Sequence, residues 1–170
     1  NPTRGPKKKL LDMATTNAKI NLENELELIL KDEQKTIEAN ESLRKILNLP
    51  ILDRIDLFDN SNLFGDFSVS GMVVFKNGKE AKNEYRKYKI SIDKNDDFNT
   101  MKEVIYRRYF RALLDKTEMP NLIIVDGGIK QINACKSVLE DLNLQIKVCG
   151  LRKNDKHRTN ALLDGNTYEE

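Results

Sequence analysis

The sequence predicts an α/β fold in which an N-terminal helical extension precedes a mixed five-stranded sheet with flanking helices. Three observations favour this fold. Apolar residues recur at helical spacing from Leu10 to Leu47, Asn77-Gly78 marks a hairpin, and Leu122 to Val125 form a short all-apolar run. Such a run is typical of a strand buried on both faces of a parallel sheet. The predicted order is therefore the extension followed by β-β-β-α-β-α-β.

Residues 1 to 50 are expected to form a basic lead-in and a helical extension. The lead-in, residues 1 to about 9, ends in Lys7, Lys8 and Lys9 and is expected to be extended. After it, apolar residues recur at steps of three and four, either in one helix or with a second helix beginning near Thr36. Pro50 is expected to end this pattern. The other helix faces are polar, so we expect the apolar stripe to pack on the domain that follows.

Residues 51 to 170 are expected to form a domain that opens with an antiparallel meander of three strands. The strands are predicted at Ile55 to Asp59, Ser68 to Phe75 and Glu84 to Ile92. The second is rich in valine, which favours strands. Asn77-Gly78 indicates a type I′ turn after it, because both central residues of that turn have positive φ.

The second half of the domain is predicted to add parallel strands through helical crossovers. Right-handed crossovers place the fourth strand most simply beside the first and parallel to it. This is the ribonuclease H-like arrangement. The predicted elements are a helix over Asp96 to Leu114 capped by Asp96 or Asp97, a strand over Leu122 to Val125, a helix over Lys130 to Leu142 and a strand over Ile146 to Cys149.

Asp59 and Asp126 are the candidate metal-binding and catalytic residues. Each stands at the C-terminal end of a predicted strand. If those strands are parallel neighbours, their backbones lie about 4.8 Å apart and both carboxylates leave the sheet at the same edge. Mg²⁺ prefers one or two carboxylates, several waters and substrate phosphate oxygens. The pair therefore suits phosphodiester hydrolysis assisted by Mg²⁺ or Mn²⁺.

Turn-forming roles are the alternative for both aspartates. Asp59-Asn60-Ser61 could form only an Asx turn, and Asp126-Gly127-Gly128 only a strand-to-helix turn. The presence of both motifs at equivalent strand ends favours the metal site. The two glycines would also let a phosphate approach closely near a helix N-terminus.

The composition fits a soluble globular domain, with 39% hydrophobic and 33% charged residues in a chain of 170. The net charge of +2 neither requires nor excludes a nucleic-acid partner. Clustered basic residues either follow a phosphate backbone or form solvated faces. The clusters are Lys7 to Lys9, then Arg107, Arg108 and Arg111, and finally Arg152, Lys153, Lys156 and Arg158.

Several features bear on the compartment. No apolar run is long enough to span a bilayer, and no signal-peptide pattern opens the chain, so no membrane partner is expected. The chain begins without Met, which suggests a fragment of a longer protein.

Cys135 and Cys149 lack the close spacing of a zinc site. We interpret both as buried thiols in a reducing compartment, which favours the cytoplasm.

Collinear segments over nearly the whole chain resemble one known family. They are Arg4 to Lys9, Arg54 to Asn62, Met72 to Phe75, Glu84 to Tyr88, Asp96 to Phe98 with Met101, Arg107 to Tyr109, Pro120 to Gly128 and Asn154 to Thr159. In these segments the chain is similar to the C-terminal nuclease half of the UvrC excinuclease family. Collinear similarity of this extent is more specific than any single motif.

The resemblance implies a ribonuclease H-like, metal-dependent endonuclease. The family nicks damaged double-stranded DNA on both sides of a lesion after UvrB has been loaded, with UvrA acting upstream, and the half that this chain resembles makes the 5′ incision. Its catalytic aspartates fall on Asp59 and Asp126 of this sequence. A third acidic family position falls on Asp97, which could equally cap the following helix.

Basic residues are expected along the DNA path. Arg107 and Arg108 are neighbours on a predicted helix, so only one of them is expected to face the groove. The family usually has Lys-Gly after the double glycine and a small residue at position 152, whereas this chain has Ile129-Lys130 and Arg152. Lys130 can still reach a phosphate from the first turn. The residues expected to bind nucleic acid are Arg107, Arg108, Lys130, Lys153, Lys156, His157 and Arg158.

The resemblance also implies an incomplete active site. The family's catalytic histidine lies beyond the end of this chain, so poor activity or none is expected from it. We interpret His157, the single histidine, as a loop residue near the DNA or a packing residue rather than a general base. Two other functions stay open, a non-catalytic DNA-binding or protein-docking module and another ribonuclease H-like nuclease acting on a different substrate.

Overall fold

A computed structural model describes residues 4–61, 69–90, 96–154, 156 and 159–165 of the chain. The chain divides into two compact units, Asn1–Ala39 and Asn40–Glu170. None of the helices within the described ranges has an apolar stretch long enough to cross a membrane.

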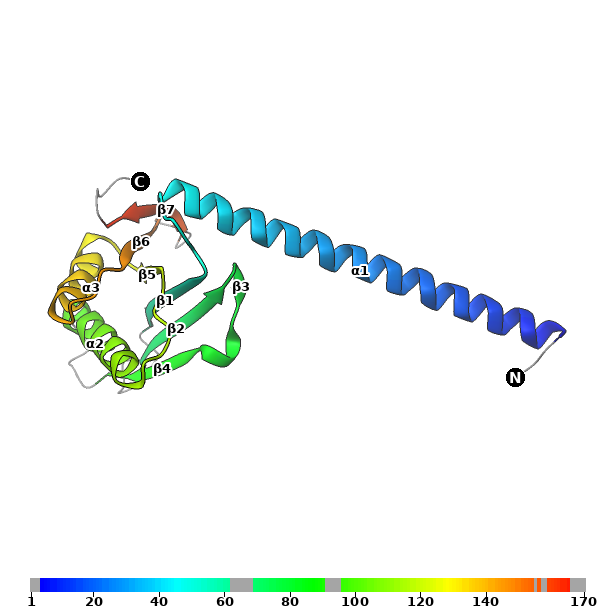
Figure 1. Ribbon diagram of the computed structural model, residues 1–170, viewed down its shortest axis with the longest axis horizontal. Helices are drawn as coiled ribbons and strands as arrows, with labels where there is room; N and C mark the ends of the chain where they lie inside the picture. The colour runs from blue at the N-terminus through cyan, green and yellow to red at the C-terminus, as the bar shows by residue number, and fades with distance from the viewer. Residues whose placement is uncertain (1–3, 62–68, 91–95, 155, 157–158, 166–170) are drawn as a thin grey trace. The chain divides into compact units, whose positions relative to one another are not determined.

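Helix α1 (Pro6–Ile46) is continuous, and Figure 1 shows it as one blue-to-cyan coil. The expectation of an extended lead-in is wrong from Pro6 onward. Proline suits the first helical turn, and the lysines after it are good helix formers. The alternative of a second helix near Thr36 is wrong as well, because α1 runs through that residue. The expected packing of the apolar stripe on the rest of the chain stays a prediction.

Asn48, rather than Pro50, ends this helix. Its φ is 51°, in the left-handed region that asparagine tolerates. The Leu49 N–H donates to the carbonyl oxygen of Arg44 over 2.9 Å. A left-handed residue with a bond back across the last turn is a common helix ending, so the chain turns before the proline is reached.

The second unit is built on one mixed sheet, in which seven strands are described. Its order is β3-β2-β1-β5-β6-β7, and β4 also pairs with β2. The β1–β5 and β5–β6 pairs are parallel, and the other pairs are antiparallel. The predicted place of the fourth strand, parallel to the first and beside it, is confirmed. The elements are β1 (Arg54–Ser61), β2 (Val69–Lys76), β3 (Lys79–Glu80), the 3-10 turn η1 (Lys82–Glu84), β4 (Arg86–Lys89), α2 (Asp97–Asp115), β5 (Leu122–Asp126), α3 (Ile129–Asp141), β6 (Lys147–Lys153) and β7 (Thr159–Asp164).

The strand count differs from the five that were predicted, for two reasons. The type I′ turn is confirmed by φ values of 49° at Asn77 and 79° at Gly78. After it the chain pairs briefly as β3, is interrupted by η1, and pairs again with β2 as β4. The last strand, β7, contains Asn160 and Asp164, which are poor strand formers, and so it gave little signal.

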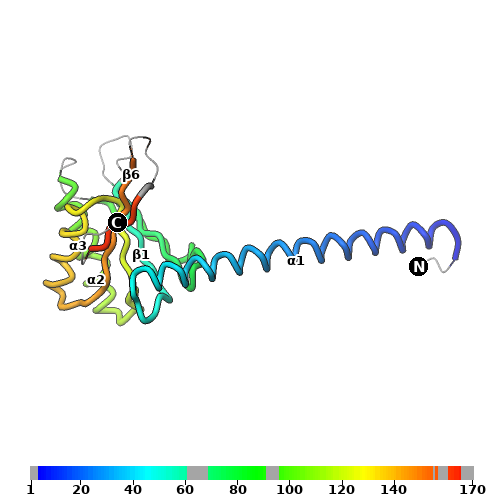
Figure 2. The backbone as a smooth tube through the Cα atoms, turned by 90° about the horizontal axis from the view of Figure 1, so that it is seen from above, coloured from blue at the N-terminus to red at the C-terminus, as the bar shows by residue number. Residues whose placement is uncertain are grey.

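Side chains of β5 alternate between two buried clusters. Ile123 and Val125 face the larger cluster, which α2 and α3 cover. Figures 1 and 2 both show these two helices together on one side of the sheet. Leu122 and Ile124 face the smaller cluster, which is completed by residues that include Leu47. Alternation therefore places Asp126, at the end of β5, on the face opposite α2 and α3.

Candidate active site

Asp59 and Asp126 lie side by side, directly after the last residue pair of the parallel strands β1 and β5. The parallel register of β1 and β5 pairs Phe58 with Val125, and the next residue of each strand is an aspartate. The two carboxyl groups are close enough to share a hydrogen bond. The structure thus brings together two residues that are 67 positions apart in the sequence, as their numbers show.

The electrostatics of this pair favour a bound cation. Burial raises the pKa of the Asp59 carboxyl, and the hydrogen bond with Asp126 and the charge of Asp126 raise that pKa further. The positive charge of Lys153 acts in the opposite direction. Two carboxyl groups this close resist simultaneous ionisation unless a positive charge lies beside them.

Lys153 supplies a positive charge beside Asp126. Its ammonium group donates a hydrogen bond to Oδ2 of Asp126. That bond raises the pKa of the Lys153 ammonium group. The contact follows from the sheet, because Asp126 pairs with Leu151 on β6 and Lys153 ends the same strand two residues later. Lys153 was expected to line a DNA path, and in the structure it contacts Asp126.

A close backbone approach holds the loop after Asp126 in place. The Gly127 N–H donates to the carbonyl oxygen of Leu151 over 3.1 Å. A Cβ atom at Gly150 would lie only 2.4 Å from the carbonyl oxygen of Gly127. Glycine at position 150 is therefore needed for the loop to reach β6, and this contact fixes the backbone beside Asp126.

The start of α2, which carries Asp97, lies near the start of α3, and the catalytic role of Asp97 stays a prediction. Asp96 caps α2, because its side chain accepts the Asn99 N–H over 3.0 Å, and this bond lowers the pKa of Asp96. Asp97, the other candidate cap, is the exposed first residue of α2. The charge of Lys130 also lowers the pKa of Asp96, so Lys130 lies near that cap. Within the described residues, no group of three or more His, Cys, Asp and Glu side chains is placed to hold a metal.

Comparison with known proteins decides the family. The model of the UvrC RNase H endonuclease domain family matches residues 44–170. The chain belongs to the UvrC family. UvrABC system protein C of Streptococcus thermophilus is 52% identical over 166 residues, which are 96% of this chain and 28% of that protein. The Streptococcus uberis protein of the same name is 49% identical over 170 residues, 99% of this chain and 29% of that protein.

Membership in the UvrC family confirms the predicted family and the predicted enzyme class, an endonuclease domain with a ribonuclease H-like fold. The chain spans less than a third of the length of the UvrC relatives that it matches. Activities and partners of the whole protein are therefore matters for proposal.

Arg107 and Arg108 make contacts within the UvrC domain itself. The Arg107 guanidinium donates to the Lys89 carbonyl oxygen over 2.6 Å and pairs with Glu103 at 3.2 Å. Arg108 is 14% exposed, and its Nε lies 3.7 Å from Oδ2 of the buried Asp56. At 1.5 Å per residue, both arginines are about 15 Å along α2 from its first residue. A phosphate contact by either arginine would compete with these contacts.

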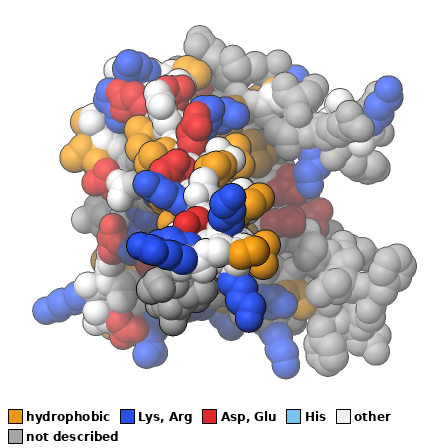
Figure 3. All heavy atoms as spheres, turned by 90° about the vertical axis from the view of Figure 1, so that its right-hand side faces the viewer, with side chains coloured by type: hydrophobic (Ala, Val, Ile, Leu, Met, Phe, Trp, Pro, Cys, Tyr) orange, Lys and Arg blue, Asp and Glu red, His pale blue; other side chains and the backbone are white. Residues whose placement is uncertain are grey.

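The remaining predicted DNA contacts lie after β6. Lys156 is exposed, and its backbone N–H donates to Oδ1 of Asn154 over 3.0 Å. His157 and Arg158 lie outside the described residues. Figure 3 shows Lys and Arg side chains interspersed with Asp and Glu side chains on the face that it presents. The nucleic-acid-binding role of these residues stays a prediction.

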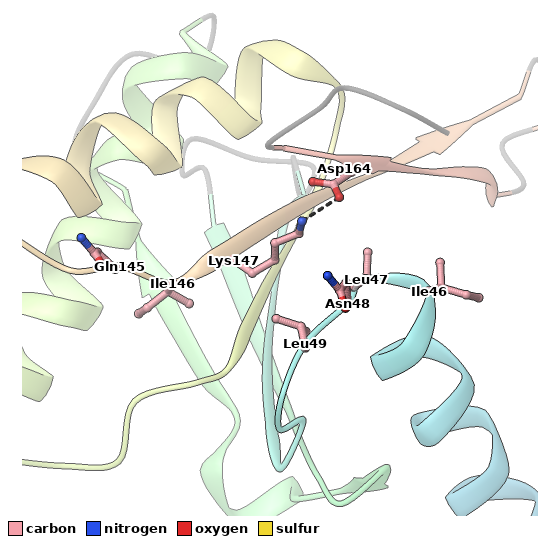
Figure 4. A pocket seen from close by; sticks show the side chains of 8 residues that line it. All are labelled: Ile46, Leu47, Asn48, Leu49, Gln145, Ile146, Lys147 and Asp164. Atoms are coloured by element: carbon pink, nitrogen blue, oxygen red, sulfur yellow. Dashed lines mark hydrogen bonds and ion pairs between the residues drawn. The ribbon is translucent and has the colours of Figure 1, made fainter.

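One cavity among the described residues of this unit is remote from the aspartate pair. It measures about 630 Å³ and includes Lys147, whose ammonium group donates to Oδ2 of Asp164 over 2.6 Å (Figure 4). Lys147 begins β6 and Lys153 ends it, so about 20 Å of strand separates the cavity from the candidate site. The cavity is lined by Ile46, Leu47, Asn48, Leu49, Gln145, Ile146, Lys147 and Asp164.

Proposed function

We propose that this domain hydrolyses a DNA phosphodiester 5′ to a lesion, with Asp59 and Asp126 holding Mg²⁺ or Mn²⁺. The observation that carries the proposal is the adjacency of the two carboxyl groups at the carboxyl ends of parallel β1 and β5. Ligands of open α/β sheets bind outside the carboxyl ends of the parallel strands. Membership in the UvrC family supports the endonuclease reaction.

The donor set fits a divalent metal ion. Mg²⁺ binds proteins through one or two carboxylates and fills its other positions with water and substrate phosphate oxygens. Asp59 and Asp126 offer two carboxyl groups whose proximity raises the pKa of Asp59, and a cation beside both would favour the ionised form of the pair. A bound ion would polarise the phosphoryl oxygen, orient the attacking water and offset charge on the leaving oxygen.

The protein's own part is to hold this pair rigidly and to leave room for the substrate backbone. β1 and β5 are paired along Ile55 to Phe58, so the two carboxyl groups are fixed by sheet hydrogen bonds. Gly128 caps α3 without a side-chain bond, and a Cβ atom there would meet nothing within 4 Å. A phosphate can therefore approach the positive end of α3 beside Asp126.

The proposed substrate is damaged double-stranded DNA and the proposed partner is UvrB, with UvrA upstream. Support comes from the relatives, which are components of a UvrABC system. The proposed compartment is the cytoplasm. Cys135 and Cys149 are buried and free, and burial raises the pKa of the Cys149 thiol to about 11. Such inert thiols suit a reducing compartment.

Isothermal titration of Mn²⁺ tests the metal site. We expect Asp126→Asn to weaken binding at least about tenfold, because the ion loses one of two charged ligands. Asp115→Asn is the matched control, since this exposed aspartate at the end of α2 pairs with Arg111 instead. Equal Mn²⁺ affinity in wild type and Asp126→Asn would remove the proposed site.

A further inference from the structure

We propose that Lys153 is a built-in competitor of the metal ion: its ammonium group pairs with Asp126 in the absence of metal and must be displaced when the ion binds. This inference rests on the proposed function, because it takes the aspartate pair as the metal site. It assigns Lys153 a role in setting metal affinity, beyond the DNA contact expected from the sequence.

The contact that carries the inference is the ion pair between Lys153 on β6 and Asp126 on β5. Lys153 is the last residue of β6, the strand next to β5, and its ammonium group donates to Oδ2 of Asp126. Its charge also acts on Asp59. The lysine thus occupies an oxygen of Asp126 that a metal ion would use.

The exposed fractions of the two side chains show that Lys153 can move away from Asp126 while the fold stays intact. The Lys153 side chain is 44% exposed, whereas that of Asp126 is 18% exposed. The carboxylate is therefore the fixed partner, and the long lysine side chain reaches it from the solvent side. Rotation about the lysine's side-chain bonds is enough to free Asp126, because exposed side chains change rotamer readily.

The charges make lysine and metal mutually exclusive. Two ionised carboxylates and one ammonium group carry a net charge of −1, and a divalent ion added to all three would make it +1. Replacing the ammonium group by the ion gives zero. An ion held by Oδ2 of Asp126 would also lie close to the ammonium group, and that repulsion is strong at short range. Metal binding and the Lys153–Asp126 bond should therefore exclude one another.

Mn²⁺ titration of Lys153 variants tests the competition. In Lys153→Gln we expect Mn²⁺ to bind about tenfold more tightly, because a like charge close to the ion is removed. Glutamine can still donate a hydrogen bond to Asp126, so the fold should be kept. Lys153→Arg keeps the charge and should bind Mn²⁺ within about twofold of wild type. Lys116→Gln, which removes an exposed lysine at the far end of α2, controls for net charge.

Electron paramagnetic resonance of free Mn²⁺ gives an independent measure of affinity. The gain in Lys153→Gln should shrink as salt increases, since salt screens the repulsion. Unchanged or weaker Mn²⁺ binding in Lys153→Gln would overturn this inference. Absence of binding in wild type, or equal binding in Asp126→Asn, would instead overturn the proposed function, so the two failures are distinguishable.

Discussion

At the scale of single residues, a buried ion pair and a tyrosine hold β1 against α2. Arg54 and Asp56 are 3% and 0% exposed, and Nε of Arg54 lies 2.9 Å from Oδ1 of Asp56. The Tyr109 hydroxyl, from α2, donates to Oδ2 of the same carboxylate over 3.0 Å. A buried charge that loses a partner is costly, so this group ties the position of β1, and with it Asp59, to the helix.

Removal of the tyrosine hydroxyl should therefore destabilise the domain. We expect Tyr109→Phe to lower the free energy of unfolding by about 1–3 kcal/mol, because Asp56 loses a donor where water cannot replace it. Urea denaturation followed by circular dichroism measures the change. Tyr106→Phe on the same helix is the control, since Tyr106 is 44% exposed and its hydroxyl can be hydrated. Equal effects of the two changes would contradict the role given to Asp56.

Individual residues also show which parts of the site could be predicted from the sequence and which could not. Asp59 and Asp126 could be predicted as a pair because each follows a short apolar run. Parallel pairing of the two runs places the residues that follow them side by side. The burial of Arg54 and Asp56 was not predicted, since alternation along a strand gives no sign that its polar face is buried. Lys153 was assigned to a basic cluster because β6 was predicted to end at Cys149, which hid its register with Asp126.

At the scale of elements, the loop between β5 and α3 depends on a glycine in the neighbouring strand. Gly150 on β6 faces the carbonyl oxygen of Gly127 and the side chain of Ile132. The sequence marked Gly127 and Gly128 as a turn, but nothing in it indicated that Gly150 must also lack a side chain. That requirement arises from pairing between strands whose register only the folded sheet shows.

Gly150→Ala should disturb both stability and the site. The new Cβ would lie 2.4 Å from the Gly127 carbonyl oxygen and 2.9 Å from Cδ1 of Ile132, so the backbone must shift. We expect a loss of about 1–3 kcal/mol of unfolding free energy, typical of overpacking, together with weaker Mn²⁺ binding at Asp126. Gly71→Ala on β2 is the matched control for stability, because its Cβ would meet nothing within 4 Å. If Gly150→Ala matched this control in stability and the wild type in Mn²⁺ binding, the close approach would not matter.

At the scale of the whole molecule, both buried clusters are made of residues from the second unit. The smaller cluster includes Leu43, Leu47 and Leu49, which lie at the end of α1 and in the turn after it. The larger cluster contains no residue before Phe58. The end of α1 therefore belongs to the domain core, although most of the helix lies in the first unit.

Two truncations separate these parts of α1. A variant that lacks residues 1–39 should unfold cooperatively in urea, with a free energy within about 0.5 kcal/mol of the full chain, because both clusters stay complete. A variant that lacks residues 1–49 loses three leucines from the smaller cluster, and loss of a buried leucine side chain typically costs about 2–5 kcal/mol. It should therefore be strongly destabilised or fail to fold. A large loss of stability on removing residues 1–39 alone would contradict this division and would show instead that the apolar stripe of α1 packs on the domain, as its periodicity predicts.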